Sequence, residues 1–146
     1  MNRTHSSALL ALLMASVAAA CGGARGSSDF VPGPAADFRT ASTAEVRTAE
    51  DQVILSGSFV ETAADSDDVE RKATLTATNA GASASGAAEV ESCRGTDCDT
   101  QEVEFDIVNA PPRAVLRLMI DGKEFGRVTS DERGRASVER DVQLPR

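Results

Sequence analysis

The stretch QEVEFDI at residues 101–107 decides the fold class of this chain. Val103, Phe105 and Ile107 alternate one for one with acidic residues along it. Successive side chains of a β-strand point to opposite faces of a sheet. The stretch therefore predicts a strand that buries one face and turns a carboxylate-bearing face toward solvent.

Two turn signals lie C-terminal to this stretch. Asp121-Gly122 separates two alternating apolar runs, and a two-residue type I′ hairpin turn needs positive φ at both central positions, which Asp-Gly tolerates. Gly134 ends the stretch SDERG and suits a left-handed residue in the next turn. Pro111 and Pro112 exclude a strand interior at their own positions, because proline cannot donate to a ladder.

The same alternation recurs on both sides of these signals. We expect about seven strands, at roughly 52–60, 69–78, 86–93, 101–108, 114–121, 123–129 and 135–143. Short strands with regular turns predict an all-β domain over 51–146, an antiparallel β-sandwich of immunoglobulin-like type, with an open barrel as the alternative. The run from residue 114 to 142 resembles the closing hairpins of exported bacterial Ig-like domains, which implies the same fold and no functional site.

The phase of the alternation predicts which side chains are buried. The most buried should be Leu55, Leu75, Val90, Val103, Phe105, Ile107, Leu116, Leu118, Ile120 and Val138. Those exposed or at a sheet edge should be Glu102, Glu104, Asp106, Thr74 and Thr76. Arg140 falls on the apolar face of its run, so we expect it to lie at an edge, to pair with an acid, or to extend its stem to water.

The N-terminus predicts an export signal over residues 1–20. Arg3 precedes an uncharged apolar run of about ten residues, the length of a signal-peptide core and short of the roughly 20 residues that span a membrane. The run ends in Val17-Ala18-Ala19-Ala20-Cys21, which resembles the lipobox of bacterial lipoproteins. This resemblance implies cleavage before Cys21, a diacylglycerol on its thiol and a fatty acyl group such as palmitate on its amino group.

The lipobox carries one departure from the family pattern. Ala18 stands where the family prefers leucine, and Ala18-Ala19-Ala20 also fits the small-x-small site of ordinary secretion. The alternative is therefore a soluble secreted protein with an unmodified Cys21.

The cysteine count favours the lipid. Three cysteines leave one unpaired in an oxidising compartment, and lipid on Cys21 accounts for it. Cys93 and Cys98 then form a structural disulfide. A redox pair is disfavoured, because dithiol oxidoreductases place Cys-x-x-Cys at a helix start. A zinc site is also disfavoured, because zinc would need four ligands and residues 22–146 offer no histidine and no further cysteine.

Residues 21–50 hold the lipid-bearing Cys21 and a stretch rich in Gly, Ser, Ala, Pro and Thr. Such a composition buries too little apolar surface to offset its ordering entropy, so we expect a flexible linker that spans about 30 Å. Phe30, Val31 and Phe38 are exceptions that could pack on the domain. A short helix over 41–50 is the alternative for the far end.

The charge and histidine content exclude several functions. Residues 21–146 hold 23 acidic and 14 basic residues, one fewer basic residue than the whole chain because Arg3 precedes them, for a net charge of −9. This charge disfavours nucleic acid as a partner. His5 is the only histidine, so residues 21–146 lack the commonest general base and metal ligand. We expect no enzyme, no catalytic residues, no cofactor and no metal.

Two sets of carboxylates are candidates for a functional site. Glu89 with Glu91, and Glu102 with Glu104, lie on one strand face each and resemble solvated outer-face charges more than a glycosidase pair, which faces across a cleft. The loop residues Asp65, Asp67, Asp68 and Glu70 predict a solvated turn. Weak calcium binding is the alternative, because calcium takes oxygen ligands.

These observations predict a membrane-tethered lipoprotein of the cell envelope that displays a small binding or structural module. Its partners would be the membrane, through the lipid on Cys21, and an envelope protein. The outer membrane is favoured over the inner one, with the domain in the periplasm or at the cell surface. The alternative is an inhibitor or accessory subunit of an envelope enzyme or secretion machine.

Overall fold

A computed structural model describes residues 29–64, 68–93 and 98–144 of the chain. These residues form ten strands and no helix. The strands are β1 (Val31–Pro32), β2 (Thr43–Thr48), β3 (Val53–Ser58), β4 (Val60–Ala64), β5 (Asp68–Ala77), β6 (Ser85–Cys93), β7 (Thr100–Val108), β8 (Val115–Ile120), β9 (Lys123–Thr129) and β10 (Ala136–Gln143). None of the described segments is a helix long and apolar enough to cross a membrane.

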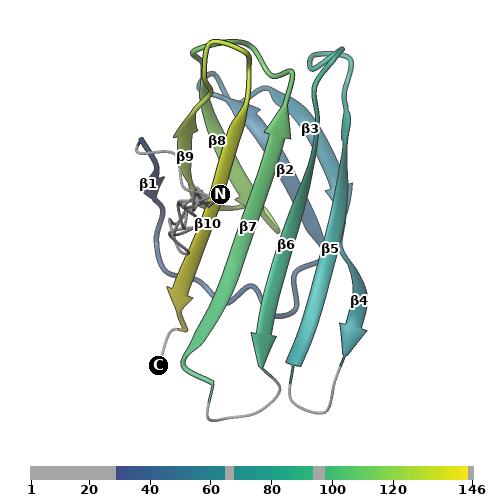
Figure 1. Ribbon diagram of the computed structural model, residues 1–146, viewed down its shortest axis with the longest axis vertical. Coiled ribbons are helices and arrows are strands. Elements are labelled where there is room, and N and C mark those ends of the chain that lie inside the picture. Colours follow the sequence, from purple (N-terminus) through teal and green to yellow (C-terminus); the bar gives the residue numbers. More distant parts are fainter. Residues whose placement is uncertain (1–28, 65–67, 94–97, 145–146) are drawn as a thin grey trace, which may run out of the picture.

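The strands form one antiparallel sheet that curls into a half-barrel (Figure 1). Its order is β1-β9-β8-β2-β3-β5-β6-β7-β10, and β4 pairs with the N-terminal half of β5. The first five strands of that order make one layer, and β4 to β7 with β10 make the other (Figure 1). Two residue pairs join the layers, Leu55 with Ala77 and Ser56 with Thr76. The all-β, antiparallel prediction is confirmed.

The predicted core is confirmed as well. All ten side chains expected to be buried have at most 1% of their surface exposed. They fill the space between the two layers, because alternate positions of each strand point inward.

Both turn signals are confirmed by backbone geometry. Asp121 and Gly122 have φ values of 47° and 72°, and Gly134 has a φ of 70°. The Asp121 carboxylate also accepts hydrogen bonds from the backbone N–H groups of Ser42 and Thr43, at 2.9 and 2.8 Å. The turn between β8 and β9 thus fixes the start of β2.

The linker prediction is wrong for the second half of its range. β2 lies in the middle of the sheet, paired with β3 on one side and β8 on the other. Ala44 and Val46 are fully buried, and Phe38 and Ala41 are nearly so. Strands on both sides of β2 take up its backbone hydrogen bonds. The strand is therefore stable although its own side chains bury few apolar atoms. The short helix considered for 41–50 is also wrong, and folded structure begins well before the boundary predicted at residue 51.

The number of strands differs from the expected seven. The run predicted over 52–60 divides into β3 and β4, and the strands of the N-terminal segment, β1 and β2, come in addition. The division falls at Phe59, whose ring is buried while its N–H donates to the Ser42 carbonyl at 2.9 Å.

Three of the five side chains predicted to be exposed are exposed, namely Asp106, Thr74 and Thr76. Glu102 and Glu104 are half-buried, and they do not lie at an edge because β7 has β6 and β10 on its two sides. Strands on both sides of β7 therefore reduce the exposure of each. The prediction for these two residues is therefore wrong.

Candidate functional site

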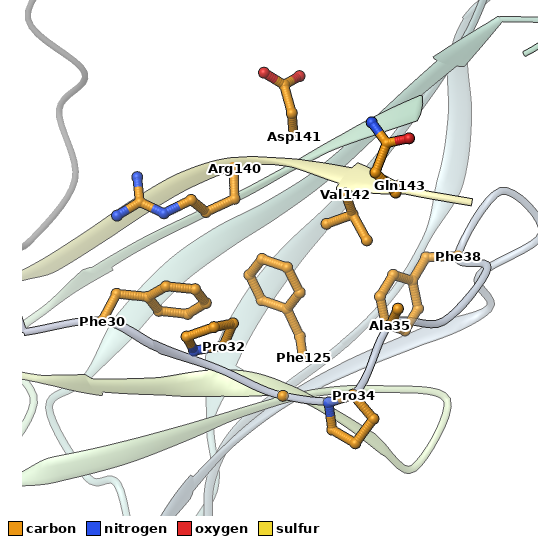
Figure 2. Close-up of a pocket in the computed structure, with 11 residues that line it drawn as sticks. Phe30, Pro32, Pro34, Ala35, Phe38, Phe125, Arg140, Asp141, Val142 and Gln143 are labelled. Carbon is orange, nitrogen blue, oxygen red and sulfur yellow. The ribbon is translucent and has the colours of Figure 1, made fainter. Parts of the chain in front are cut away.

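The half-barrel leaves an open seam between its two end strands, β1 and β10. A pocket of about 360 Å³ lies at this seam (Figure 2). Aromatic and proline side chains of the N-terminal segment and β9 form one wall, and β10 forms the other. Its lining includes Phe30, Phe38, Phe125, Arg140 and Val142.

Phenylalanines concentrate at this seam. The chain has five, and three of them surround Phe125 of β9. The Phe125 ring centroid lies 5.3 Å from that of Phe30, 5.9 Å from Phe105 in a stacked arrangement, and 6.1 Å from Phe38 in an edge-on one. Rings at these separations and angles attract one another beyond simple burial. The cluster makes the pocket floor apolar.

A buried glutamine holds the pocket wall in place. Gln101 begins the stretch that decided the fold class, and only 1% of its surface is exposed. Its Oε1 accepts from the Phe38 N–H at 2.8 Å, and its Nε2 donates to the Ala36 carbonyl at 2.6 Å. Both groups would otherwise be buried without a partner, which is costly. Gln101 thereby attaches the N-terminal segment to β7 across the half-barrel.

Arg140 lies where the two walls meet. Its guanidinium carbon is 5.3 Å from the centre of the Phe30 ring, a distance at which a cation is attracted to the ring face. Its Nη1 donates to the Glu139 carbonyl at 3.0 Å. Because β10 is the last strand of the order, the expectation of an edge position is confirmed. The aromatic partner was not foreseen.

The outer surface of the second layer carries a second feature, the acidic face. It consists of Glu70, Glu89, Glu91, Glu102, Glu104, Asp106, Glu139 and Asp141. Strand pairing sets these carboxylates opposite one another: Glu89 faces Glu104, which faces Glu139. Like charges directly opposite in a sheet repel. Within the described parts of β5, β6, β7 and β10, Lys72 is the only basic residue whose alternation places it on this face.

Burial, and after it the neighbouring carboxylates, alter the proton affinity of several of these groups. Burial, together with a hydrogen bond to the Glu70 carboxylate, raises the pKa of Glu89 to about 7. Lys72 opposes this rise: its Nζ lies 3.2 Å from Glu89 Oε2 and also contacts Glu70. Burial and neighbouring carboxylates likewise raise the pKa values of Glu102 and Glu104. Glu89, Glu102 and Glu104 therefore keep their protons to higher pH than isolated carboxylates would. Hydrogen bonds to Glu89 and Lys72, in contrast, lower the pKa of Glu70.

The outer surface of the first layer provides a contrast. Arg47, Arg117 and Arg127 lie directly opposite one another there. Acids neutralise this row: Arg117 contacts Asp51 at 2.6 Å and Glu124 at 2.8 Å, and Arg127 contacts Glu124 at 2.8 Å. A like-charge row is thus compensated within the first layer, whereas the acidic face has one lysine for eight carboxylates.

The structure brings one predicted pair together. Cys93 and Cys98 form a disulfide with their Cα atoms 5.9 Å apart, a usual separation for such a bond. Cys21 lies outside the described residues, as do Asp65 and Asp67 of the acidic loop. The prediction of a solvated turn is wrong for Asp68 and Glu70, because both belong to β5 and pair there with β6; Glu70 also contacts Lys72. Among the residues that the structure describes, no group of three or more His, Cys, Asp or Glu is placed to hold a metal.

The seam pocket was not predicted from the sequence. The available signal was the pair Phe30 and Phe38, two large apolar residues in a segment otherwise poor in them. The acidic face was foreseen only as solvated charge, because pairing between strands decides which carboxylates become neighbours.

Fold and site together define a small antiparallel β-module with an apolar seam and an acidic outer face. Comparison of the chain with models of protein families, with curated proteins and with solved structures finds no match.

Proposed function

We propose that this chain is a bacterial envelope lipoprotein, anchored through lipid on Cys21, whose β-module is a binding domain and not an enzyme. The observation that carries the anchor is the arrangement of the cysteines. Cys93 and Cys98 lie together as a pair, so Cys21 is the one cysteine left over. It directly follows the apolar run and the three alanines that resemble a lipobox.

The position of the first strand fits a short tether. β1 begins at Val31, and the intervening chain from Cys21 can reach at most about 35 Å when fully extended. Lipid on Cys21 would keep the module close to a membrane surface. A module held this close meets its partners within the envelope.

Detergent phase partition tests the anchor. The wild-type protein should enter the detergent phase, and the Cys21→Ser variant should move to the aqueous phase because it cannot receive the lipid. A Cys93→Ser/Cys98→Ser variant is the matched control and should partition as the wild type does. Wild-type protein found wholly in the aqueous phase would refute the anchor.

The binding role is supported by two surfaces that folding alone does not require. The seam leaves an apolar pocket lined by Phe30 and Phe125 accessible, and the acidic face retains like-charge neighbours. Residues 21–146 contain no histidine, and Cys93 and Cys98 are joined. A histidine base and a free thiol nucleophile within the β-module are therefore lacking, which favours binding over catalysis.

We propose in addition that the half-barrel is a variant of the immunoglobulin-like sandwich. Two observations support this: the layers pack face to face through Phe105 and Phe125, and only two residue pairs connect β3 to β5. A crystal structure of the mature protein tests it. Loss of the pairs Leu55–Ala77 and Ser56–Thr76 would leave two separate sheets, as in a sandwich; their retention would make the half-barrel the right description.

A further inference from the structure

We infer that the free edge of β10 receives an extended segment of an envelope protein in which basic and apolar residues alternate. This partner specifies the binding function proposed above and rests on it. Three features carry the inference: the backbone edge, the pocket on the inner side of β10, and the acidic face on its outer side.

The edge of β10 is long and regular. The strand pairs with β7 over all 8 of its residues without a bulge, and it is the last strand in the sheet order. One side of its backbone therefore has no strand neighbour among the described residues. Such an edge readily takes another strand, whose main chain supplies the hydrogen bonds.

The two sides of β10 dictate the side chains of the incoming strand. Alternate residues of an added strand would point to opposite faces. Those on the inner side would meet Val142 and the ring of Phe125, as Figure 2 shows. They would also lie beside the aliphatic stem of Arg140, whose guanidinium rests on the Phe30 ring, and so should be apolar. Those on the outer side would meet Glu139 and Asp141, and so should be basic.

Protection of the edge against aggregation explains only part of this charge. Natural proteins place charges on edge strands for that purpose. However, Glu104 lies one strand in from the edge and Glu89 two strands in. Protection of the edge does not require a charged residue at either position. The raised pKa values of both residues show that these positions are costly for an ionised carboxylate. A cationic strand on β10 would lie beside Glu139, which is directly opposite Glu104, and would offset part of the negative charge that surrounds Glu104.

A second copy of this chain is a poorer occupant. Two β10 strands side by side would bring Glu139 and Asp141 of one copy next to the same residues of the other. Like charges in adjacent strands destabilise the pairing. The charge of the edge therefore selects a basic segment.

Peptide binding to the mature protein in a nonionic detergent tests the inference. The probe is a fluorescent peptide with the 8-residue length of β10, made of alternating lysine and valine. The controls are the same residues in block order, lysines before valines, and a glutamate–valine alternation. We expect the alternating basic peptide to bind at least about tenfold more tightly than either control, because only it can fill both faces at once.

Backbone methylation distinguishes strand pairing from charge attraction. In an added strand only every second N–H points toward β10. Methylation of one alternate set of peptide nitrogens should therefore abolish binding, while methylation of the other set should leave it largely intact. Equal effects of the two sets would overturn strand addition.

Matched variants of the protein locate the site. Glu139→Gln/Asp141→Asn and Val142→Asn should each weaken binding by about tenfold. Glu50→Gln and Val60→Asn change exposed residues far along the chain from β10 and should leave binding unchanged. Circular dichroism should show that all four variants keep their strand content.

Each outcome decides the inference independently of the anchor. Equal affinity for the alternating and block peptides, or undiminished binding by the β10 variants, would show general charge attraction and overturn it. Absence of binding by a protein that still partitions into detergent would overturn the inference and leave the proposed anchor standing. A protein that binds the alternating peptide but stays in the aqueous phase would overturn the proposed anchor and leave the inference standing.

Discussion

The raised pKa of Glu89, in the middle of the acidic face, makes the stability of the folded protein depend on pH. Glu89 keeps its proton to about pH 7 in the folded state, against a usual pKa of 4.5. The unfolded chain releases that proton near pH 4.5, so the folded state binds more protons between these values. The free energy of unfolding therefore falls as pH rises from about 4.5 to 7.

The variant Glu89→Gln should remove this pH dependence. A glutamine amide can donate to the Glu70 carboxylate as the protonated Glu89 does, without an ionised form to destabilise. We expect a gain of about 1 kcal/mol in unfolding free energy at pH 8, after allowance for solvent screening, and no gain at pH 4. Urea titrations at both pH values measure it. The exposed Glu91→Gln serves as control, and an equal gain for both variants would contradict the account.

Two glycines with the same backbone conformation form a second residue-scale test. Gly122 and Gly134 have φ values of 72° and 70°. A Cβ at Gly122 meets nothing within 4 Å, whereas one at Gly134 would overlap the Ala110 carbonyl. Gly122→Ala should cost about 1 kcal/mol from its backbone alone. Gly134→Ala should cost about 3 kcal/mol because overlap is added, and similar losses for both in thermal unfolding would be inconsistent with the turn geometry.

At the scale of elements, the strands that could be predicted are those with large apolar residues in strict alternation. β7 and β8 present such runs, and the sequence placed their buried faces correctly. β2 could not be found this way. Its inward residues include Ala44, which is too small to mark a strand, and its stability comes from β3 and β8 pairing on its two sides, a contact that local pattern does not contain.

The importance of β2 can be tested by truncation. A chain that begins at residue 51 lacks the strand between β3 and β8, so it should expose two open backbone edges and the core residues Leu55 and Leu118. A chain that begins at residue 29 keeps β2 and should fold. Circular dichroism and limited proteolysis should show a folded longer chain and an unfolded shorter one. Cooperative unfolding of the shorter chain would contradict the central place of β2.

The half-barrel as a whole explains why the site was harder to predict than the fold. The seam pocket joins Phe30 and Phe38 to Phe125 and Val142, and these residues come from opposite ends of the chain. Gln101 is polar, and its sequence neighbours predict a surface position. It is buried because residues 36–38 pack over it and take up both of its side-chain hydrogen bonds. Long-range pairing of this kind leaves no local trace in the sequence.

The two layers also differ as charged surfaces. Arginines and acids pair across the first layer, whereas the acidic face of the second layer concentrates much of the negative charge. The whole molecule thus has a balanced side and an acidic side. This asymmetry, next to an open apolar seam, is the surface that the proposed basic partner would meet.

Mass spectrometry of the N-terminal peptide from protein purified out of the membrane fraction tests the anchor most directly. The account predicts a peptide that begins at Cys21 and carries the mass of a diacylglycerol on its thiol, with or without an acyl group on its amino terminus. A peptide that begins at Cys21 with a free thiol, or one that begins at another residue, would contradict it.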